Sequence, residues 1–324
     1  MAQIEWIFPS SVDEALYALS QSGHQAVAGG TTLFDLMKLG HAVGPVLVDV
    51  SKLPLTSISQ HDDYIHIGAL ASNSDVAKSS LISEHLPALS EAILSGASEQ
   101  IRNAASIGGN LLQATRCIYF RDTSWACNRR VEGAGCEALQ VPTSGHAILG
   151  TSSACIATQP SDMAVALLAM DAIIVAQYRG LNIRIPIADF FRKPDQKAMP
   201  LNTLPVNALI TSVEVPSGRM QAKSGYLKLR GRASYEFASA SVAACLELDD
   251  NKISRAAIAY GGVGTVPWRD VNAERLLLGH IPSRNQIDLY LDRVFEHAEI
   301  RPETAHKVSL ARGAVHHMLE RLAQ

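Results

Sequence analysis

Four of the five cysteines in this chain lie together in one irregular segment, and this constrains its fold more than any other feature. They are Cys117, Cys127, Cys136 and Cys155, with the spacing C-x9-C-x8-C-x18-C, in a stretch rich in Gly, Ser, Thr and Arg. Because such a stretch has little core of its own, a bound metal can close it. The spacing matches neither the compact ferredoxin run nor the paired C-x2-C of zinc ribbons. The residues alone favour a metal or an iron–sulfur cluster, and they leave a disulfide pair or coincidence open.

Length and composition describe an ordinary globular chain. With 324 residues it can form two domains, and its net charge of −3 gives no indication of nucleic acid or an anionic membrane as a partner. The N-terminal segment lacks the basic and apolar regions of a secretory signal, and the longest apolar run, Met163 to Ala176, is too short to span a bilayer. We therefore expect folding in the cytoplasm, where reducing conditions favour thiolate ligands over disulfides. A periplasmic location stays open if the chain is exported in a folded complex that carries a partner's signal.

The expected elements change in character near residue 205. Before it, short strands alternate with helices: we predict strands at 25–28, 46–50, 64–69 and 172–178, and helices at 33–39, 86–102 and 160–170. After it come longer strand candidates at 208–216, 225–230, 239–248 and 253–260, and then a helical tail. Cys245 lies in one of these apolar strands, so we expect it to be a buried thiol apart from the other four.

Two turns of small residues are candidates for phosphate binding. Gly29-Gly30-Thr31-Thr32 lies between a predicted strand and a predicted helix, where glycines let the backbone approach a diphosphate and free N–H groups attract negative charge. Ser106-Ile107-Gly108-Gly109-Asn110 follows a predicted helix and can form a second cradle. A plain tight turn and a glycine-terminated helix explain the two motifs as well. The pattern G-x-G-x-x-G is absent from the sequence, so nothing supports a Rossmann dinucleotide site.

Several single residues have both a functional and a structural interpretation. Asp162 can bond a ribose or ring hydroxyl, or it can simply cap the start of a helix. His146 can be a zinc ligand, although we expect a surface-loop histidine. Four arginines crowd the cysteine segment and can offset the negative charge of a cluster; a solvated loop or a docking surface explains them equally. They are Arg116, Arg121, Arg129 and Arg130.

Five motifs in order resemble the FAD-binding subunit of the xanthine dehydrogenase family. They are AVAGGTTLFDLMKLG at 26–40, IRNAASIGGNLLQ at 101–113, CIATQPSDMAVALLAMDA at 155–172, YLKLRGRASYEFASASVAA at 226–244 and GGVGTVPWR at 261–269. Most members lack a cysteine segment such as TRCIYFRDTSWACNRRVEGAGCEAL at 115–139. This segment is similar to one in 4-hydroxybenzoyl-CoA reductases, and it most resembles the flavin subunit of bacterial aldehyde oxidoreductases, which binds a [4Fe-4S] cluster.

The resemblance implies an α+β fold. It places a two-lobed FAD-binding domain of the vanillyl-alcohol oxidase type at residues 1–205, with the cluster loop inserted at 114–156. A C-terminal flavoprotein domain is expected at 206–324, where a three- or four-stranded antiparallel sheet packs against helices.

The resemblance also implies the site residues. It assigns the FAD diphosphate to Gln25, Ala26, Val27, Ala28, Gly29, Gly30, Thr31, Thr32 and Leu33, with a second cradle at Ser106, Ile107, Gly108, Gly109 and Asn110. Asp162 is expected near the ribityl and adenine side, and Lys228 near the flavin ring, where its charge would stabilise reduced anionic flavin. Cys117, Cys127, Cys136 and Cys155 are the expected ligands of one [4Fe-4S] cluster. The first loop has no histidine, so the FAD is expected to be noncovalent.

The implied function is electron transfer within a complex. Electrons would start at a molybdenum cofactor in a large partner subunit, pass through [2Fe-2S] clusters in a small one, and reach the FAD of this chain. No substrate-oxidising residue is then expected here. Two alternatives stay open: a self-contained FAD oxidase or dehydrogenase, with His24, His41 or His66 as its base, and a zinc-stapled scaffold subunit.

Overall fold

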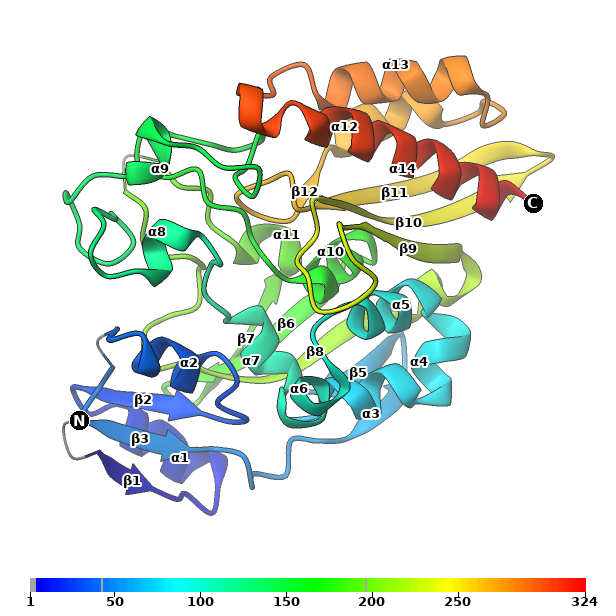
Figure 1. Ribbon diagram of the computed structural model, residues 1–324. Coiled ribbons are helices and arrows are strands. Elements are labelled where there is room, and N and C mark those ends of the chain that lie inside the picture. The colour runs from blue at the N-terminus through cyan, green and yellow to red at the C-terminus, as the bar shows by residue number, and fades with distance from the viewer. Residues whose placement is uncertain (1–3, 42, 196) are drawn as a thin grey trace.

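The computed structural model describes residues 4–41, 43–195 and 197–324, which contain three sheets (Figure 1). The N-terminal lobe holds a small parallel sheet in the order β1 (Glu5–Ile7), β3 (Val46–Asp49) and β2 (His24–Val27). Helix α1 (Val12–Leu19) packs on this sheet, and its buried residues share a core with β3. Helix α2 (Leu33–Lys38) follows β2 and carries no buried residue. This lobe therefore has a small core, and its β2–α2 turn lies at the edge of the sheet.

The second lobe is built on a five-stranded antiparallel sheet. Its strand order is β4 (Ile58–His61), β5 (Tyr64–Gly68), β8 (Leu209–Pro216), β6 (Ile173–Tyr178) and β7 (Leu181–Pro186). Alternate residues of its strands, such as Ile65, Ile67 and Val213, join a core formed with helices on one face. The helices that contribute to this core are α3 (Asn73–Lys78), α4 (Ser80–His85), α5 (Pro87–Ser95), α7 (Ile107–Leu111), α10 (Asp162–Ala169) and α11 (Ile187–Phe190).

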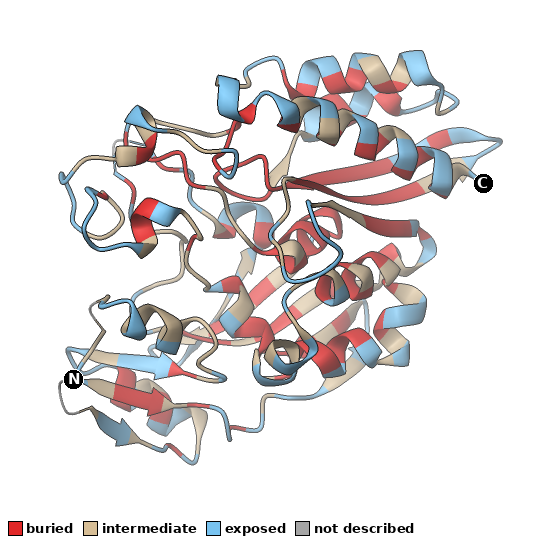
Figure 2. Cartoon of the chain, viewed as in Figure 1, coloured by how far each residue is buried: buried red, intermediate tan, exposed pale blue. Residues whose placement is uncertain are grey.

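The third sheet is antiparallel and lies toward the C-terminus. Its order is β12 (Trp268–Arg269), β11 (Lys252–Gly261), β10 (Ala240–Asp249) and β9 (Lys223–Leu229). Along β10, Ala243 and Cys245 join the core that contains α5 and α10. Val242 and Ala244 join a second core with α13 (Arg284–Val294) and α14 (His306–Ala323). Both faces of the sheet are thus covered, and Figure 2 shows its strands buried along most of their length.

The α+β fold expected from the sequence is confirmed. The N-terminal part forms two lobes, and the C-terminal part is an antiparallel sheet of four strands packed against helices. Cys245 is a buried strand thiol, as predicted, and burial raises its pKa to about 11.

Two expectations about single elements were wrong. The strand at 208–216 does not join the C-terminal sheet: as β8 it lies between β5 and β6 in the second lobe. The helix expected over 86–102 is two helices, α5 and α6 (Glu99–Ala104). They are separated at Gly96, which is extended, and Ala97, whose φ is +51°. Arg102 donates to the carbonyl oxygens of both residues and so stabilises the break.

The cysteine segment connects α7 to α10 and is mostly irregular. It contains two single-turn helices, α8 (Ile118–Arg121) and α9 (Glu137–Gln140). In Figure 1 these helices lie at the left, above the N-terminal lobe. Within the described ranges, no helix combines the length and the apolar character needed to cross a membrane.

Candidate functional site

The first small-residue turn joins β2 to α2. Of its predicted residues, Gln25, Ala26 and Val27 lie in β2, Ala28, Gly29, Gly30, Thr31 and Thr32 form the turn, and Leu33 begins α2. Gly30 has a φ of +66°, a conformation that glycine adopts without strain. In the part of the chain that the structure describes, no protein group accepts a hydrogen bond from the N–H groups of Gly30, Thr31 or Thr32. These three donors are available to an anionic ligand.

Gly29 brings this turn into contact with the second one. An ideal Cβ atom on Gly29 would lie 1.7 Å from the carbonyl oxygen of Ala104. Ala104 is the last residue of α6 and precedes Ser106 by two positions. Because any side chain at Gly29 would overlap this carbonyl group, the close approach of the two backbones requires glycine.

The second turn differs from the first in its hydrogen bonding. Ser106 caps α7 through a bond from the N–H of Gly109 to its Oγ atom, 3.2 Å long. Ile107 and Gly108 donate to the carbonyl groups of Ala71 and Ala69, just after β5, and Asn110 donates to the carbonyl of Ser106. Their N–H groups are therefore already occupied. The second turn can form a wall beside a ligand, whereas the first turn offers the free donors.

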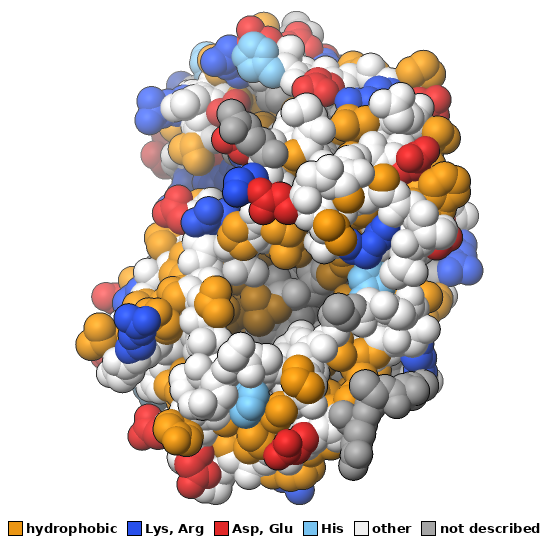
Figure 3. Space-filling model, turned by 90° about the vertical axis from the view of Figure 1, so that its left-hand side faces the viewer, with side chains coloured by type: hydrophobic (Ala, Val, Ile, Leu, Met, Phe, Trp, Pro, Cys, Tyr) orange, Lys and Arg blue, Asp and Glu red, His pale blue; other side chains and the backbone are white. Residues whose placement is uncertain are grey.

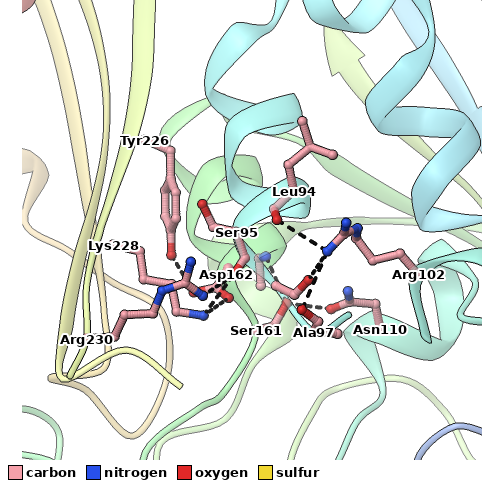
Figure 4. Close-up of polar contacts among 12 residues, drawn as sticks. Leu94, Ser95, Ala97, Arg102, Asn110, Ser161, Asp162, Tyr226, Lys228 and Arg230 are labelled. Carbon is pink, nitrogen blue, oxygen red and sulfur yellow. Dashed lines mark hydrogen bonds and ion pairs between the residues drawn. The ribbon is translucent and has the colours of Figure 1, made fainter. Parts of the chain in front are cut away.

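Asp162 and Lys228 form a buried ion pair (Figure 4). Their Oδ2 and Nζ atoms are 2.8 Å apart, with side chains that are 9% and 3% exposed. The Tyr226 hydroxyl donates to the other Asp162 oxygen at 2.5 Å. Burial raises the pKa of Tyr226 well above its usual range, and the Asp162 charge adds to this shift. Both predicted residues thus lie in one network between α10 and β9, and the positive charge of Lys228 is paired.

The start of α10 connects this network to the second turn. Ser161, not Asp162, caps the helix, because its Oγ atom accepts a bond from the N–H of Ala164. The same hydroxyl donates to Oδ1 of Asn110 at 2.6 Å. Asp162 is the first residue of the helix, so its carboxylate is free to pair with Lys228. The capping role that we considered for Asp162 is therefore wrong.

The four cysteines of the segment line one shared hollow. Cys127 and Cys136 face each other in an isolated antiparallel bridge, while Cys117 and Cys136 are the N-cap residues that precede the short helices α8 and α9. Burial raises the pKa of Cys117 to about 11. Metal binding at such thiols releases protons, because the ligand is the thiolate. The four cysteines of the segment thus converge, and they are free thiols.

The convergence does not have the geometry of a single metal ion. Across residues 4–41, 43–195 and 197–324, no three His, Cys, Asp or Glu side chains are arranged to hold one ion. A single zinc ion needs all of its ligand atoms within about 2.3 Å of one point. A cubic cluster is less demanding, because each of its four thiolates binds a different iron atom. The four thiols around this hollow supply the donor set that a cluster with four thiolate ligands needs.

The environment of His146 differs from the expectation. His146 is buried, with 2% of its surface exposed, so the expected surface-loop position was wrong. Its Nδ1 atom accepts a bond from the N–H of Thr143, its Nε2 atom lies 3.4 Å from Sγ of Cys117, and burial lowers its pKa to about 4. His24 and His66 lie on strands of two different sheets, and His41 contacts the carbonyl group of Arg121.

The face of the molecule that carries the N-terminal lobe and the cysteine segment is hollowed near its middle (Figure 3). Arg116 links these two parts, since it pairs with Asp35 of α2 at 3.3 Å and lies 3.4 Å from the Thr32 hydroxyl. Its guanidinium also lies over the ring of Phe237, in the loop between β9 and β10. Three distant parts of the chain therefore meet beside the first turn.

Comparisons with known proteins give the family. Residues 2–218 match the FAD binding domain in molybdopterin dehydrogenase, and residues 225–322 match the CO dehydrogenase flavoprotein C-terminal domain. The chain belongs to this family of FAD-binding subunits. It is 40% identical over 302 residues to the aldehyde oxidoreductase FAD-binding subunit PaoB of Escherichia coli (strain K12), covering 93% of this chain and 92% of that protein. It is 24% identical to the carbon monoxide dehydrogenase medium chain of Hydrogenophaga pseudoflava, covering 95% and 93% of the two chains.

Solved structures of other proteins share the fold of this chain. Carbon monoxide dehydrogenase from Hydrogenophaga pseudoflava superposes with a TM-score of 0.77 at 22% identity, covering 99% of this chain and 97% of the other. Quinoline 2-oxidoreductase from Pseudomonas putida 86 gives 0.76 at 18% identity, with the same coverage. At these sequence identities, the structural similarity establishes the fold only.

Sequence reasoning missed the partners of the predicted residues. Tyr226 in β9 and Arg230 just after this strand each lie two residues from Lys228, and they join the same network through Asp162 and the carbonyl of Ser95. The alternation in YLKLR could have indicated that the three side chains share one face. Asp35 carried no such signal, because its arginine partners are distant in sequence.

Proposed function

We propose that this chain is the electron-transfer flavin subunit of a molybdenum-containing aldehyde oxidoreductase. Its large partner would hold the molybdenum cofactor, and its small partner would hold [2Fe-2S] clusters. The observation that carries the proposal is the contact of Gly29 with Ala104, which joins the two turns and leaves free N–H donors on one of them. The 40% identity to a protein named as an aldehyde oxidoreductase subunit supports the choice of complex.

The residues of the two turns fit FAD. The free N–H groups of Gly30, Thr31 and Thr32 would bind diphosphate oxygens, and Ser106 to Asn110 would form the wall on the other side. Bound FAD would supply the redox chemistry, accepting electrons and passing them to an external acceptor. Asp162 and Lys228 would hold α10 and β9 together beside the flavin as a pair. Since Lys228 is paired, we assign it a positioning role together with Asp162.

The cysteine segment fits a [4Fe-4S] cluster held by Cys117, Cys127, Cys136 and Cys155. The segment has only single-turn helices and small local cores, so a cluster would also stabilise its fold. We further propose that the FAD-binding domain, with this segment at 114–156 inserted, extends through β8 and that the C-terminal domain begins with β9. The pairing of β8 with β5 and β6 supports this division over one at residue 205.

The surface of the cysteine segment supports assembly with partners. Ile118, Trp125, Val131 and Val141 are large apolar residues that are each about half exposed or more. Apolar residues gathered on one segment are typical of surfaces that another protein covers.

Cofactor analysis of the anaerobically purified chain tests the proposal. We expect one FAD per chain, released by acid precipitation, and about four irons per chain. Flavin that stays with the precipitated protein would contradict noncovalent binding. Stoichiometric zinc without iron would support the scaffold alternative, and flavin without iron or zinc would support a self-contained flavoenzyme.

A further inference from the structure

The four arginines of the cysteine segment have different partners. Arg116 and Arg121 both pair with Asp35 of α2, at 3.3 Å and 2.5 Å. Arg130 donates to three backbone carbonyl groups of the segment. These three side chains bind the segment to itself or to the N-terminal lobe, because a carboxylate or backbone carbonyl groups accept their hydrogen bonds. Arg129 differs from them.

Arg129 contacts a cysteine directly. Its Nε atom lies 3.0 Å from Sγ of Cys155, and the backbone N–H of Ala157 donates to the same sulfur at 3.4 Å. Within the described ranges, no carboxylate forms an ion pair with Arg129. Its positive charge is therefore directed at the sulfur, without a neighbouring anion to offset it.

Arg129 also stands between two hollows. It lines the hollow shared by the four cysteines. It also lines a second hollow, whose other lining residues include Leu111 and Gln113, where α7 ends. The α7 helix carries the second small-residue turn. Arg129 thus lies between the cysteine hollow and the segment that follows α7.

We infer that Arg129 sets the reduction potential of the proposed cluster by donating a charged hydrogen bond to the Cys155 sulfur. The inference rests on the proposed cluster. Hydrogen bonds to cluster sulfurs and nearby positive charge both favour the more negative, reduced cluster, so they raise its potential. Hydrogen bonds that involve a charged group are roughly twice as strong as those between neutral groups, so loss of this one should be measurable. Arg129 is a positioning residue in this role, since it acts through Cys155.

Redox titration of the assembled complex tests this, with the EPR signal of the reduced [4Fe-4S] cluster as the readout. In Arg129→Gln the equilibrium constant for reduction should fall at least tenfold, which is about 59 mV for one electron. Arg129→Lys keeps the charge but loses the planar donor, and its potential should fall by less. Arg192→Gln is the matched control, because it removes one positive charge from the second hollow and touches no cysteine.

The outcomes separate the two claims. Absence of iron from the wild-type complex would reject the cluster, and with it this inference. A wild-type iron content with unchanged potentials in both Arg129 variants would reject the inference alone. If Arg129→Gln loses the cluster, Arg129→Lys decides: a lower potential supports the role of Arg129, and a wild-type potential overturns it. A shift in Arg192→Gln as large as that in Arg129→Gln would show a general charge effect and also overturn it.

Discussion

Replacing Gly29 with alanine would force the two small-residue turns apart. The added Cβ atom would lie 1.7 Å from the Ala104 oxygen and 2.6 Å from its carbonyl carbon. Ordinary contacts of this kind begin at 3.4 Å, so the two backbones must separate by about 1.7 Å. Both partners are backbone, and neither can rotate away. The cost of such overpacking is about 1–3 kcal/mol, and here we expect the upper half of that range.

FAD affinity should fall when the two turns separate, because the ligand needs both turns at their native distance. If about 2–3 kcal/mol is lost from binding, FAD affinity falls by about 30-fold to 150-fold. The assay is a fluorescence titration of FAD into the apoprotein, with circular dichroism to show that the variant folds. Gly313→Ala in α14 is the control, since its Cβ atom meets nothing within 4 Å and FAD affinity should not change. A folded Gly29→Ala variant with wild-type FAD affinity would refute the assignment of the two turns.

Three further predictions follow from the buried residues. Cys117→Ser should lower the iron content well below about four per chain, while Cys245→Ala should leave it unchanged, as metal analysis will show. Asp162→Ala should destabilise the protein by about 3–5 kcal/mol in urea unfolding because Lys228 is left buried and unpaired, and adding Lys228→Met should restore part of the loss; equal stability of the single and double variants would contradict the pairing. Burial raises the pKa of Cys245 from 9.0 to about 11, so its protonated form stabilises the fold fully below pH 9, and this contribution is lost as pH rises to 11. The stability difference between wild type and Cys245→Ala should therefore narrow by at most about 3 kcal/mol over that interval; a constant difference would contradict the burial effect.

Local patterns predicted much of the fold. The apolar run around Cys245 indicated a buried strand, and β10 is covered on both faces. The Gly-Gly-Thr-Thr turn was expected between a strand and a helix, and it joins β2 to α2. The clustered cysteines were expected to share a site, and they line one hollow. In each case the information lies within a short stretch of chain.

Non-local pairings could not be predicted in the same way. The sequence of β8 specifies a strand but does not specify its neighbours, so it was assigned to the wrong sheet. The ion pair of Asp162 and Lys228 joins residues 66 positions apart, and neither local sequence indicates the other. His146 follows Thr143, Ser144 and Gly145, a local composition typical of a surface loop, yet the chain packs around it. Burial of this kind depends on how separate segments meet.

Electron flow into the flavin tests the central claim most directly. The chain, assembled with the proposed molybdenum and [2Fe-2S] partner subunits, is mixed with an aldehyde under anaerobic conditions while its flavin absorption is followed. We expect the flavin band to bleach in the complex and to stay unchanged when aldehyde is added to the chain alone. Bleaching or aldehyde turnover by the chain alone, with molybdenum shown to be absent, would contradict the account and identify a self-contained flavoenzyme.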